Sequence, residues 1–324
     1  MTSRRKFLSQ IGVTVASPTI LLSQEKEEQK HSRWELIFNN DEIQIPKFKP
    51  NPKEWSNDTI TVAWLGHATL LINFFGTIII TDPVFADRVG IRLFGFFKIG
   101  PKRLVAPALS FDELPTIDLM LLSHAHFDHL DIPTLHQFDD SIPIVMAKNT
   151  SDVIRNLDKE KVKELDWGEK FSVAGIEIEA LEVKHFGWRY PWKQDRSRGN
   201  FNGRSYNAYL LSKNGKHIVF GGDTSNQDFF LRIRERKLEI ELAIMPIGAY
   251  DPWIMNHASP EQSLNMAEQM SAKYFLPIHW STFRLSNEPT TEPIERLKKA
   301  MENSSVQLAL DSIGQTWIGG KNDV

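Results

Sequence analysis

The chain contains the stretch Leu119-Met120-Leu121-Leu122-Ser123-His124-Ala125-His126-Phe127-Asp128-His129, in which an apolar run leads directly into three histidines and an aspartate. The apolar residues predict a buried strand, so the polar ones lie on the loop that leaves its end. Because side chains alternate along an extended segment, His124 and His126 can face one metal ion. Asp128 and His129 can then turn toward a second ion. A histidine-rich surface loop is the alternative, but this spacing is rare without a metal.

Three further candidate ligands follow predicted strands later in the chain. They are His185 after residues 179–184, Asp223 after 218–222 and His279 after 275–278. Each one alone would more often be an ordinary polar residue, a core residue or a turn former. Their recurrence at strand ends in one chain predicts a site for two metal ions.

Composition narrows the choice of metal and substrate. The 324 residues include no cysteine, so metal ligands must come from histidine and carboxylate side chains, which suit zinc. Two zinc ions are therefore expected, with other divalent transition metals possible because affinity order alone does not decide which ion is bound in a cell. The net charge of −3 provides no basic field for a phosphate backbone, so no nucleic acid partner is expected.

Strand signals dominate the rest of the chain. Short β-branched and apolar runs predict strands over 60–65, 69–74, 77–81, 118–122, 142–146, 171–183, 206–211, 217–221 and 306–310. Asn214-Gly215 predicts a hairpin turn. Ser259 followed by Pro260 and Gln262 predicts the start of a helix that ends near Met270, and residues 291–301 predict a second one. An α/β fold with two mixed sheets packed face to face and helices outside is consistent with this pattern.

The N-terminal segment has the features of an export signal. Arg4 and Arg5 precede Phe7-Leu8 and a short apolar run at 11–22, a pattern that resembles a twin-arginine signal. We therefore expect residues 1–28 to direct export to the periplasm or cell envelope by the twin-arginine machinery. A basic frayed terminus on a cytoplasmic protein is the alternative. Residues 29–57 are expected to form a polar linker or surface arm, and residues 58–324 the main folded domain, which carries all the candidate ligands.

The ligand pattern as a whole resembles the metallo-β-lactamase superfamily. The resemblance is carried by His-Ala-His-Phe-Asp-His at 124–129, the later His185, Gly-Gly-Asp-Thr at 221–224 and Pro-Ile-His-Trp at 277–280, and it extends over residues 60–317. It implies a four-layer αββα sandwich. It also implies that His124, His126 and His185 hold one metal. Asp128, His129 and His279 would then hold the other, with Asp223 bridging.

Four shorter stretches are similar to the N-acylphosphatidylethanolamine-hydrolysing phospholipase D family. They are residues 64–67, 81–85, 245–250 and 277–283, whereas residues 186–207 depart from the pattern of that family. The resemblance implies a phosphodiesterase that releases phosphatidic acid from a lipid substrate. A hydroxide shared by the two metals would attack phosphorus, and Asp128 would orient it or carry its proton.

Other activities are compatible with the same ligands. A lactonase or carboxylic ester hydrolase could use the same hydroxide at a carbonyl carbon of a small-molecule substrate. A nuclease uses the same chemistry but needs a basic surface. A non-catalytic metal-binding protein is also possible, since a fold does not fix a function. The sequence does not indicate an oligomeric state.

Several further residues are candidates for supporting roles. Asp82, at a strand end, is expected to orient a ligand imidazole or to serve as a turn carboxylate. Contacts to an anionic substrate are expected from His67, Arg189, Arg204 and Tyr250, although surface arginines are usually only solvated. An apolar stretch at 93–97, between Arg92 and Lys98, could bind acyl chains or contact a membrane surface, with core packing as the alternative.

Overall fold

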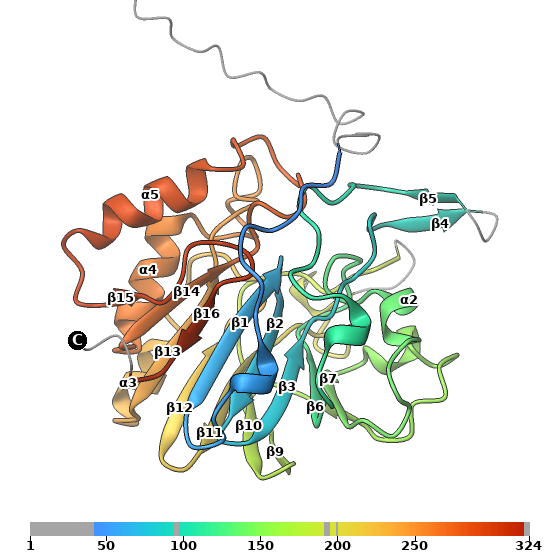
Figure 1. Ribbon diagram of the computed structural model, residues 1–324, viewed down its shortest axis with the longest axis horizontal. Helices are drawn as coiled ribbons and strands as arrows, with labels where there is room; N and C mark the ends of the chain where they lie inside the picture. The colour runs from blue at the N-terminus through green and yellow to red at the C-terminus, as the bar shows by residue number, and fades with distance from the viewer. Residues whose placement is uncertain (1–41, 94–96, 191–194, 199, 321–324) are drawn as a thin grey trace, which may run out of the picture. The chain divides into compact units, whose positions relative to one another are not determined.

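Two seven-stranded sheets form the body of the protein (Figure 1). The structure, a computed structural model, describes residues 42–93, 97–190, 195–198 and 200–320. The predicted signal at residues 1–28 and the first part of the predicted arm lie outside the described residues. Within the described part of the arm, Gln44 pairs with Val105 in an isolated bridge. No described helix has the length and apolar character needed to cross a membrane.

The first sheet begins with an antiparallel meander and continues with parallel strands. Its members, in sheet order, are β16 (Thr316–Ile318), β1 (Ile60–Gly66), β2 (Thr69–Phe74), β3 (Thr77–Thr81), β6 (Leu119–Leu122), β7 (Ile144–Ala147) and β8 (Val162–Leu165). Every residue of β1 and β2 is buried. These continuous apolar runs indicate strands that are covered on both faces.

The second sheet combines antiparallel and parallel pairing in the same way. Its members, in sheet order, are β15 (Gln307–Leu308), β14 (Tyr274–Ile278), β13 (Ile240–Pro246), β12 (Lys216–Phe220), β11 (Ala208–Lys213), β10 (Ile176–Leu181) and β9 (Lys170–Val173). A separate hairpin pairs β4 (Ile91–Leu93) with β5 (Phe97–Ile99). Of the predicted apolar stretch at 93–97, residues 94–96 lie outside the described part of the chain.

Helices lie outside the two sheets (Figure 1). The α-helices are α2 (Ile132–Leu135), α3 (Leu231–Glu235), α4 (Pro260–Gln269) and α5 (Glu292–Met301). Short 3-10 turns occur at Pro52–Glu54, Phe111–Glu113, Ser151–Val153 and Arg196–Arg198. α4 packs against β13 and against α5, and one hydrophobic core joins the sheets and the helices. The predicted αββα sandwich is confirmed.

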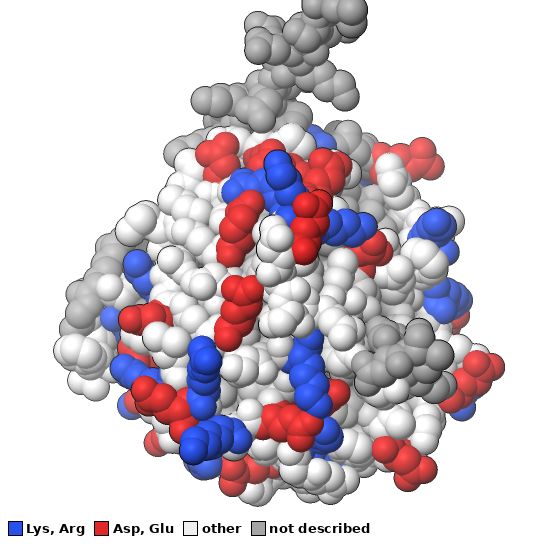
Figure 2. Space-filling view, turned by 90° about the vertical axis from the view of Figure 1, so that its left-hand side faces the viewer, with Lys and Arg blue, Asp and Glu red and all other residues white. Residues whose placement is uncertain are grey.

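Charged side chains of both signs are interspersed on the face of the molecule shown in Figure 2. Ion pairs such as Arg296 with Glu261 and Lys216 with Glu239, each at 2.7 Å, join neighbouring elements of the second half of the chain. Exposed pairs of this kind contribute at most about 1 kcal/mol each to stability. The helices on this side are therefore held by their apolar faces rather than by surface charge.

Local signals in the sequence explain which elements were predicted correctly. Asn214 and Gly215 both have positive φ, at 52° and 72°, as the predicted hairpin turn requires. Ser259 and Gln262 form the predicted capping box at the start of α4. The single strand predicted over 171–183 is wrong. Ala174 and Gly175 turn the chain back with φ values of 49° and 75°, so β9 and β10 form a hairpin.

The central strand β13 was not predicted. Its sequence, Ile-Glu-Leu-Ala-Ile-Met-Pro, is rich in residues that favour helices, and its alternation of polar and apolar residues is weak. Parallel pairing with β12 on one side and β14 on the other buries all seven residues. Tertiary burial therefore overrides the local preference.

Candidate metal centre

Four strands bring the candidate ligands to one edge of the sandwich. In the first sheet, β6 ends just before the loop at 123–129. In the second sheet, β10, β12 and β14 run in one direction, because β10 is antiparallel to β11, β11 to β12, and β12 through β14 are parallel. Their carboxyl ends therefore lie together and precede His185, Asp223 and His279, respectively.

The loop at 123–129 is folded into a tight turn. The carbonyl of His126 accepts hydrogen bonds from the N–H groups of His129 and Leu130, at 3.2 and 2.8 Å. Arg189 Nη1 donates to the carbonyls of Ala125 and Leu130, both at 2.8 Å, and Arg189 is buried. Its guanidinium, predicted to contact an anionic substrate, thus holds the ligand loop in place.

His124, His126, His185 and Asp223 form the first cluster. His126 presents Nδ1, which lies 2.7 Å from His124 Nε2 and 3.3 Å from His185 Nε2. Asp223 Oδ2 lies 3.8 Å from His124 Nε2 and 3.7 Å from His185 Nε2. Three nitrogen atoms and one carboxylate oxygen converge, as a four-coordinate metal site requires.

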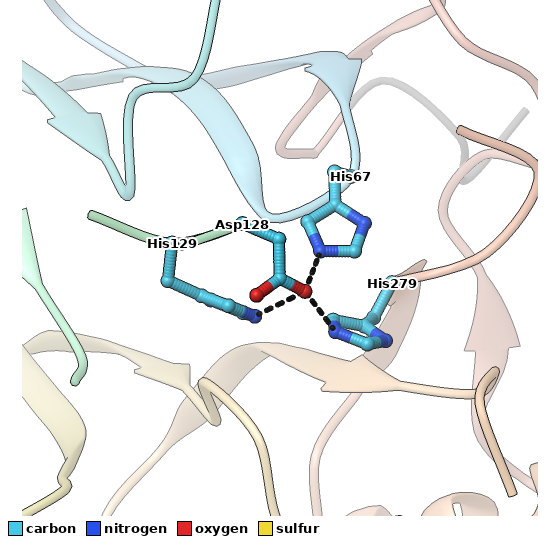
Figure 3. Close-up of side chains that lie close together, drawn as sticks. All are labelled: His67, Asp128, His129 and His279. Carbon is cyan, nitrogen blue, oxygen red and sulfur yellow. Dashed lines mark hydrogen bonds and ion pairs between the residues drawn. The ribbon is translucent and has the colours of Figure 1, made fainter. Parts of the chain in front are cut away.

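Asp128, His129 and His279 form a second cluster beside the first, and His67 lies close enough to belong to the same group of possible ligands (Figure 3). Asp128 Oδ2 lies 3.7 Å from His129 Nε2 and 3.5 Å from His279 Nε2. Asp223 Oδ2 is closer, at 3.2 and 3.1 Å from the same two nitrogen atoms. Since Asp223 Oδ2 also faces the first cluster, it is the carboxylate oxygen placed to bridge two ions.

The two clusters fit divalent metal ions. A tetrahedral site with metal–ligand distances of about 2.0–2.2 Å places its ligand atoms roughly 3.3–3.6 Å apart, close to the 3.1–3.7 Å separations of the second cluster. Nε2 of His129 and of His279 and both oxygens of Asp223 are buried without a hydrogen-bond partner among the described residues. Such atoms are rare in proteins unless an ion or water satisfies them. Imidazole and carboxylate are suitable donors for zinc and similar ions.

Burial and charge set the protonation of these groups. Burial lowers the pKa of His126 to about 3, and it likewise lowers the pKa of His124 and His185, so these imidazoles are neutral and can offer a lone pair. Burial also disfavours the charged form of His279, but the charges of Asp223 and Asp128 outweigh it and raise the pKa of His279 to about 9. The cluster therefore attracts positive charge, which a metal ion supplies by displacing the proton.

Asp82 links ligands of the two clusters. Asp82 Oδ2 accepts hydrogen bonds from His129 Nδ1 at 2.7 Å and from the Ser123 hydroxyl at 2.6 Å. Ser123 Oγ lies 2.9 Å from His124 Nδ1 and accepts its hydrogen. The network places a hydrogen on Nδ1 of both imidazoles and directs both Nε2 atoms into the clusters. The predicted orienting carboxylate thus lies directly behind two of the candidate ligands, His124 and His129.

Replacement Asp82→Asn is expected to weaken metal binding or turnover by about 10- to 100-fold. Both carboxylate oxygens of Asp82 accept hydrogen bonds, Oδ1 from the Ser123 N–H and Oδ2 from His129 and the Ser123 hydroxyl, so the NH2 group of an amide would face one of these donors. Metal affinity measured by competition with a chelator tests this. Asp118→Asn is the matched control, since Asp118 accepts a hydrogen bond from the Ile78 N–H near the opposite end of β6. Equal metal affinity in the Asp82 variant and the control would contradict the role of Asp82.

Two predicted substrate contacts lie outside the clusters. Arg204 forms an ion pair with Asp152 at 2.7 Å and is buried there. The Tyr250 hydroxyl donates to Glu292 at 2.7 Å, and the Arg296 guanidinium lies over its ring. Both side chains therefore use their polar groups within the fold. His67, by contrast, lies against the second cluster.

His257 was not predicted. Its Nδ1 is buried 3.9 Å from Asp223 Oδ2, and its ring lies beside those of His185 and His279. The neighbouring Asn256 carbonyl accepts a hydrogen bond from His185 Nδ1 at 2.9 Å. These residues follow no strand but precede α4, so the strand-end signal that identified the other ligands could not find them.

An apolar pocket of about 320 Å³ opens beside the clusters. His126 and Asp128 line one side of it, and Trp188 is 41% exposed where the pocket meets solvent. The other lining residues are Val89, Gly90, Pro101, Phe127, Phe186, Arg189 and Leu285. The pocket can bind an apolar chain next to the candidate metal centre.

A family model described as the Beta-lactamase superfamily domain matches residues 77–280 of the chain, a range that includes all seven candidate ligands. The chain is 31% identical over 264 residues to N-acyl-phosphatidylethanolamine-hydrolyzing phospholipase D 1 of Caenorhabditis elegans, covering 76% of this chain and 71% of that protein. It is 29% identical over 312 residues to an uncharacterized protein of Mycobacterium tuberculosis, covering 92% and 80%.

A solved structure of similar fold is isothiocyanate hydrolase from Delia radicum gut bacteria. The TM-score is 0.63 at 16% sequence identity, and the match covers 79% of this chain and 97% of that one. At this level of identity the similarity supports the fold and not the reaction.

Proposed function

The chain belongs to the metallo-β-lactamase superfamily of metal-dependent hydrolases, and from that premise we propose that it is a dinuclear zinc phosphodiesterase acting on N-acylphosphatidylethanolamine-type lipids. The observation that carries the proposal is the apolar pocket whose wall includes His126 and Asp128. A lipid whose chain lies in this pocket brings its headgroup to the clusters. The named relative in Caenorhabditis elegans supports the phosphodiester as the reacting group.

Bound divalent ions would supply a water of near-neutral pKa and positive charge for the departing oxygen. The chain itself supplies orientation and proton transfer. Among the described residues, the hydrogen bond and ion pairs of Asp128 all use Oδ2. Oδ1 is therefore left to accept a proton, and Asp128 lines the pocket from which substrate arrives.

The pocket contributes binding energy through chain burial. Each buried methylene contributes about 0.8 kcal/mol, so a few carbons of an acyl chain are enough to favour a lipid over its short-chain analogue. Phe127, Phe186 and Leu285 provide apolar walls. A small polar diester would gain little from such an apolar pocket. The pocket therefore favours a lipid substrate.

Trp188→Ala is expected to lower kcat/KM for long-chain substrate by about 5- to 30-fold, the effect of losing roughly 1–2 kcal/mol of chain contact. A short-chain diester should be cleaved at the wild-type rate. Trp253→Ala is the matched control, because Trp253 is 43% exposed and does not line the pocket. Equal losses in both variants, or equal losses on both substrates, would exclude the pocket as the chain site.

The proposed function is tested by incubating zinc-loaded protein with N-acylphosphatidylethanolamine in mixed micelles, with Asp223→Ala protein as the blank. Release of phosphatidic acid in the first sample alone is expected. Release of free fatty acid instead would identify hydrolysis at a carbonyl carbon, either of an O-acyl ester or of the N-acyl amide. Cleavage of neither bond, with both ions bound, would reject the proposal.

A further inference from the structure

His67 lies on the turn between β1 and β2, outside the region matched by the family model. It is 1% exposed and has a φ of 54°. This left-handed backbone conformation costs a residue other than glycine on the order of 1 kcal/mol. It persists only where surrounding contacts hold it. The contacts that hold His67 come from the loop after β14, in the other sheet, and from Trp64 on β1.

The backbone of His67 is tied to the loop that follows β14. Its N–H donates to Thr282 Oγ1 at 2.7 Å, and its carbonyl accepts from the His279 N–H at 3.1 Å. The same carbonyl accepts from Trp64 Nε1 at 2.8 Å. The position of the His67 ring is therefore fixed relative to His279, a ligand of the second cluster.

The side chain of His67 points at Asp128, as Figure 3 shows. His67 Nε2 lies 2.9 Å from Asp128 Oδ2, which is a hydrogen-bond distance. The ring lies 4.1 Å from that of His279 and 5.2 Å from that of Phe283, centroid to centroid. An imidazole nitrogen at this distance from a carboxylate oxygen donates its hydrogen, because an ionised carboxylate can only accept.

We propose that His67 is a positioning residue that donates its Nε2 hydrogen to Asp128 Oδ2 and thereby sets the affinity of the second metal site. This inference rests on the proposed dinuclear function, since it assumes that Asp128, His129 and His279 hold an ion. The hydrogen bond directs Oδ2 toward the two imidazoles and leaves Oδ1 outside these contacts. Without it, the carboxylate can rotate, because Asp128 is 15% exposed and its remaining contacts run through the same oxygen.

The test compares His67→Gln with His67→Met. The two side chains have nearly the same length and volume, but only glutamine can donate a hydrogen bond from the position of Nε2. Affinities for two zinc ions are measured by chelator competition, and the visible spectrum of the cobalt-loaded protein reports the geometry around each ion. Thermal melting shows whether each variant is folded.

We expect the His67→Met variant to bind one of the two zinc ions about 10- to 100-fold more weakly than the wild type and to show a changed cobalt spectrum. The zinc affinities of the His67→Gln variant should lie within a few-fold of the wild-type values. Wild-type affinity and spectrum in a folded methionine variant would overturn the inference. Equal weakening by glutamine and methionine would also overturn it, because packing alone would then explain the effect. If the methionine variant does not fold, His67→Leu replaces it as the variant without a hydrogen-bond donor. Its zinc affinities and cobalt spectrum are then compared with those of His67→Gln.

These measurements use no substrate. If the proposed function is wrong while His67 acts as inferred, the zinc affinities of the His67→Met and His67→Gln variants will still differ. Phospholipid turnover will then be absent even from the wild-type protein.

Discussion

Replacing Asp223 with alanine is expected to abolish hydrolysis and to release at least one of two bound metal ions. Asp223 Oδ2 lies 3.1 Å from His279 Nε2 and 3.2 Å from His129 Nε2. It also lies 3.7 and 3.8 Å from the Nε2 atoms of His185 and His124. Losing several kcal/mol of charge stabilisation at such a position lowers kcat/KM by about a thousandfold or more.

The measurement combines metal content per chain with turnover of a phosphodiester substrate. Asp228→Ala is the control, since Asp228 is exposed on the segment after Asp223. It should keep both ions and full activity. An Asp223→Ala protein that holds two ions and turns over at the control rate would contradict the bridging assignment.

Removal of metal by a strong chelator is expected to abolish activity and to lower the melting temperature. The two clusters hold buried imidazole and carboxylate atoms that lack partners among the described residues, and the ions are expected to satisfy them. A ligand present at a hundred times its dissociation constant stabilises the folded state by about 2.7 kcal/mol. For a domain of this size that corresponds to roughly 5–10 °C in melting temperature.

Activity and stability should return together as zinc, cobalt or manganese is added back, reaching a plateau at two ions per chain. The Asp223→Ala variant should show a smaller thermal shift on the same titration, because it lacks a ligand. Undiminished turnover by protein shown to contain no metal would rule out a metal-dependent reaction. A plateau at one ion would rule out the dinuclear site.

The candidate ligands could be proposed from the sequence because the segments that carry them follow apolar strands. His124, Asp223 and His279 each stand one to three residues beyond β6, β12 or β14. The assignment of the seven residues to two metal sites came from the resemblance to the metallo-β-lactamase superfamily. The pairing of those strands in two facing sheets then brings the seven residues together. Their identity as ligands remains a prediction until metal content is measured.

Other parts of the site depend on contacts that sequence order does not reveal. Arg204 was chosen for its charge, but it is paired with Asp152, 52 residues earlier in the chain. Tyr250 was predicted to contact an anionic substrate, but its hydroxyl donates to Glu292, 42 residues later. His257 reaches the clusters only because of the path of the loop before α4. In each case the decisive interaction is tertiary and leaves no local pattern.

The most direct test of the phosphodiesterase account is hydrolysis of N-acylphosphatidylethanolamine by zinc-loaded protein in water enriched in oxygen-18. Attack of water at phosphorus predicts one labelled oxygen in the phosphate of phosphatidic acid and none in the released N-acylethanolamine. Label in a free fatty acid, or in the N-acylethanolamine, would contradict attack at phosphorus and with it the proposed function.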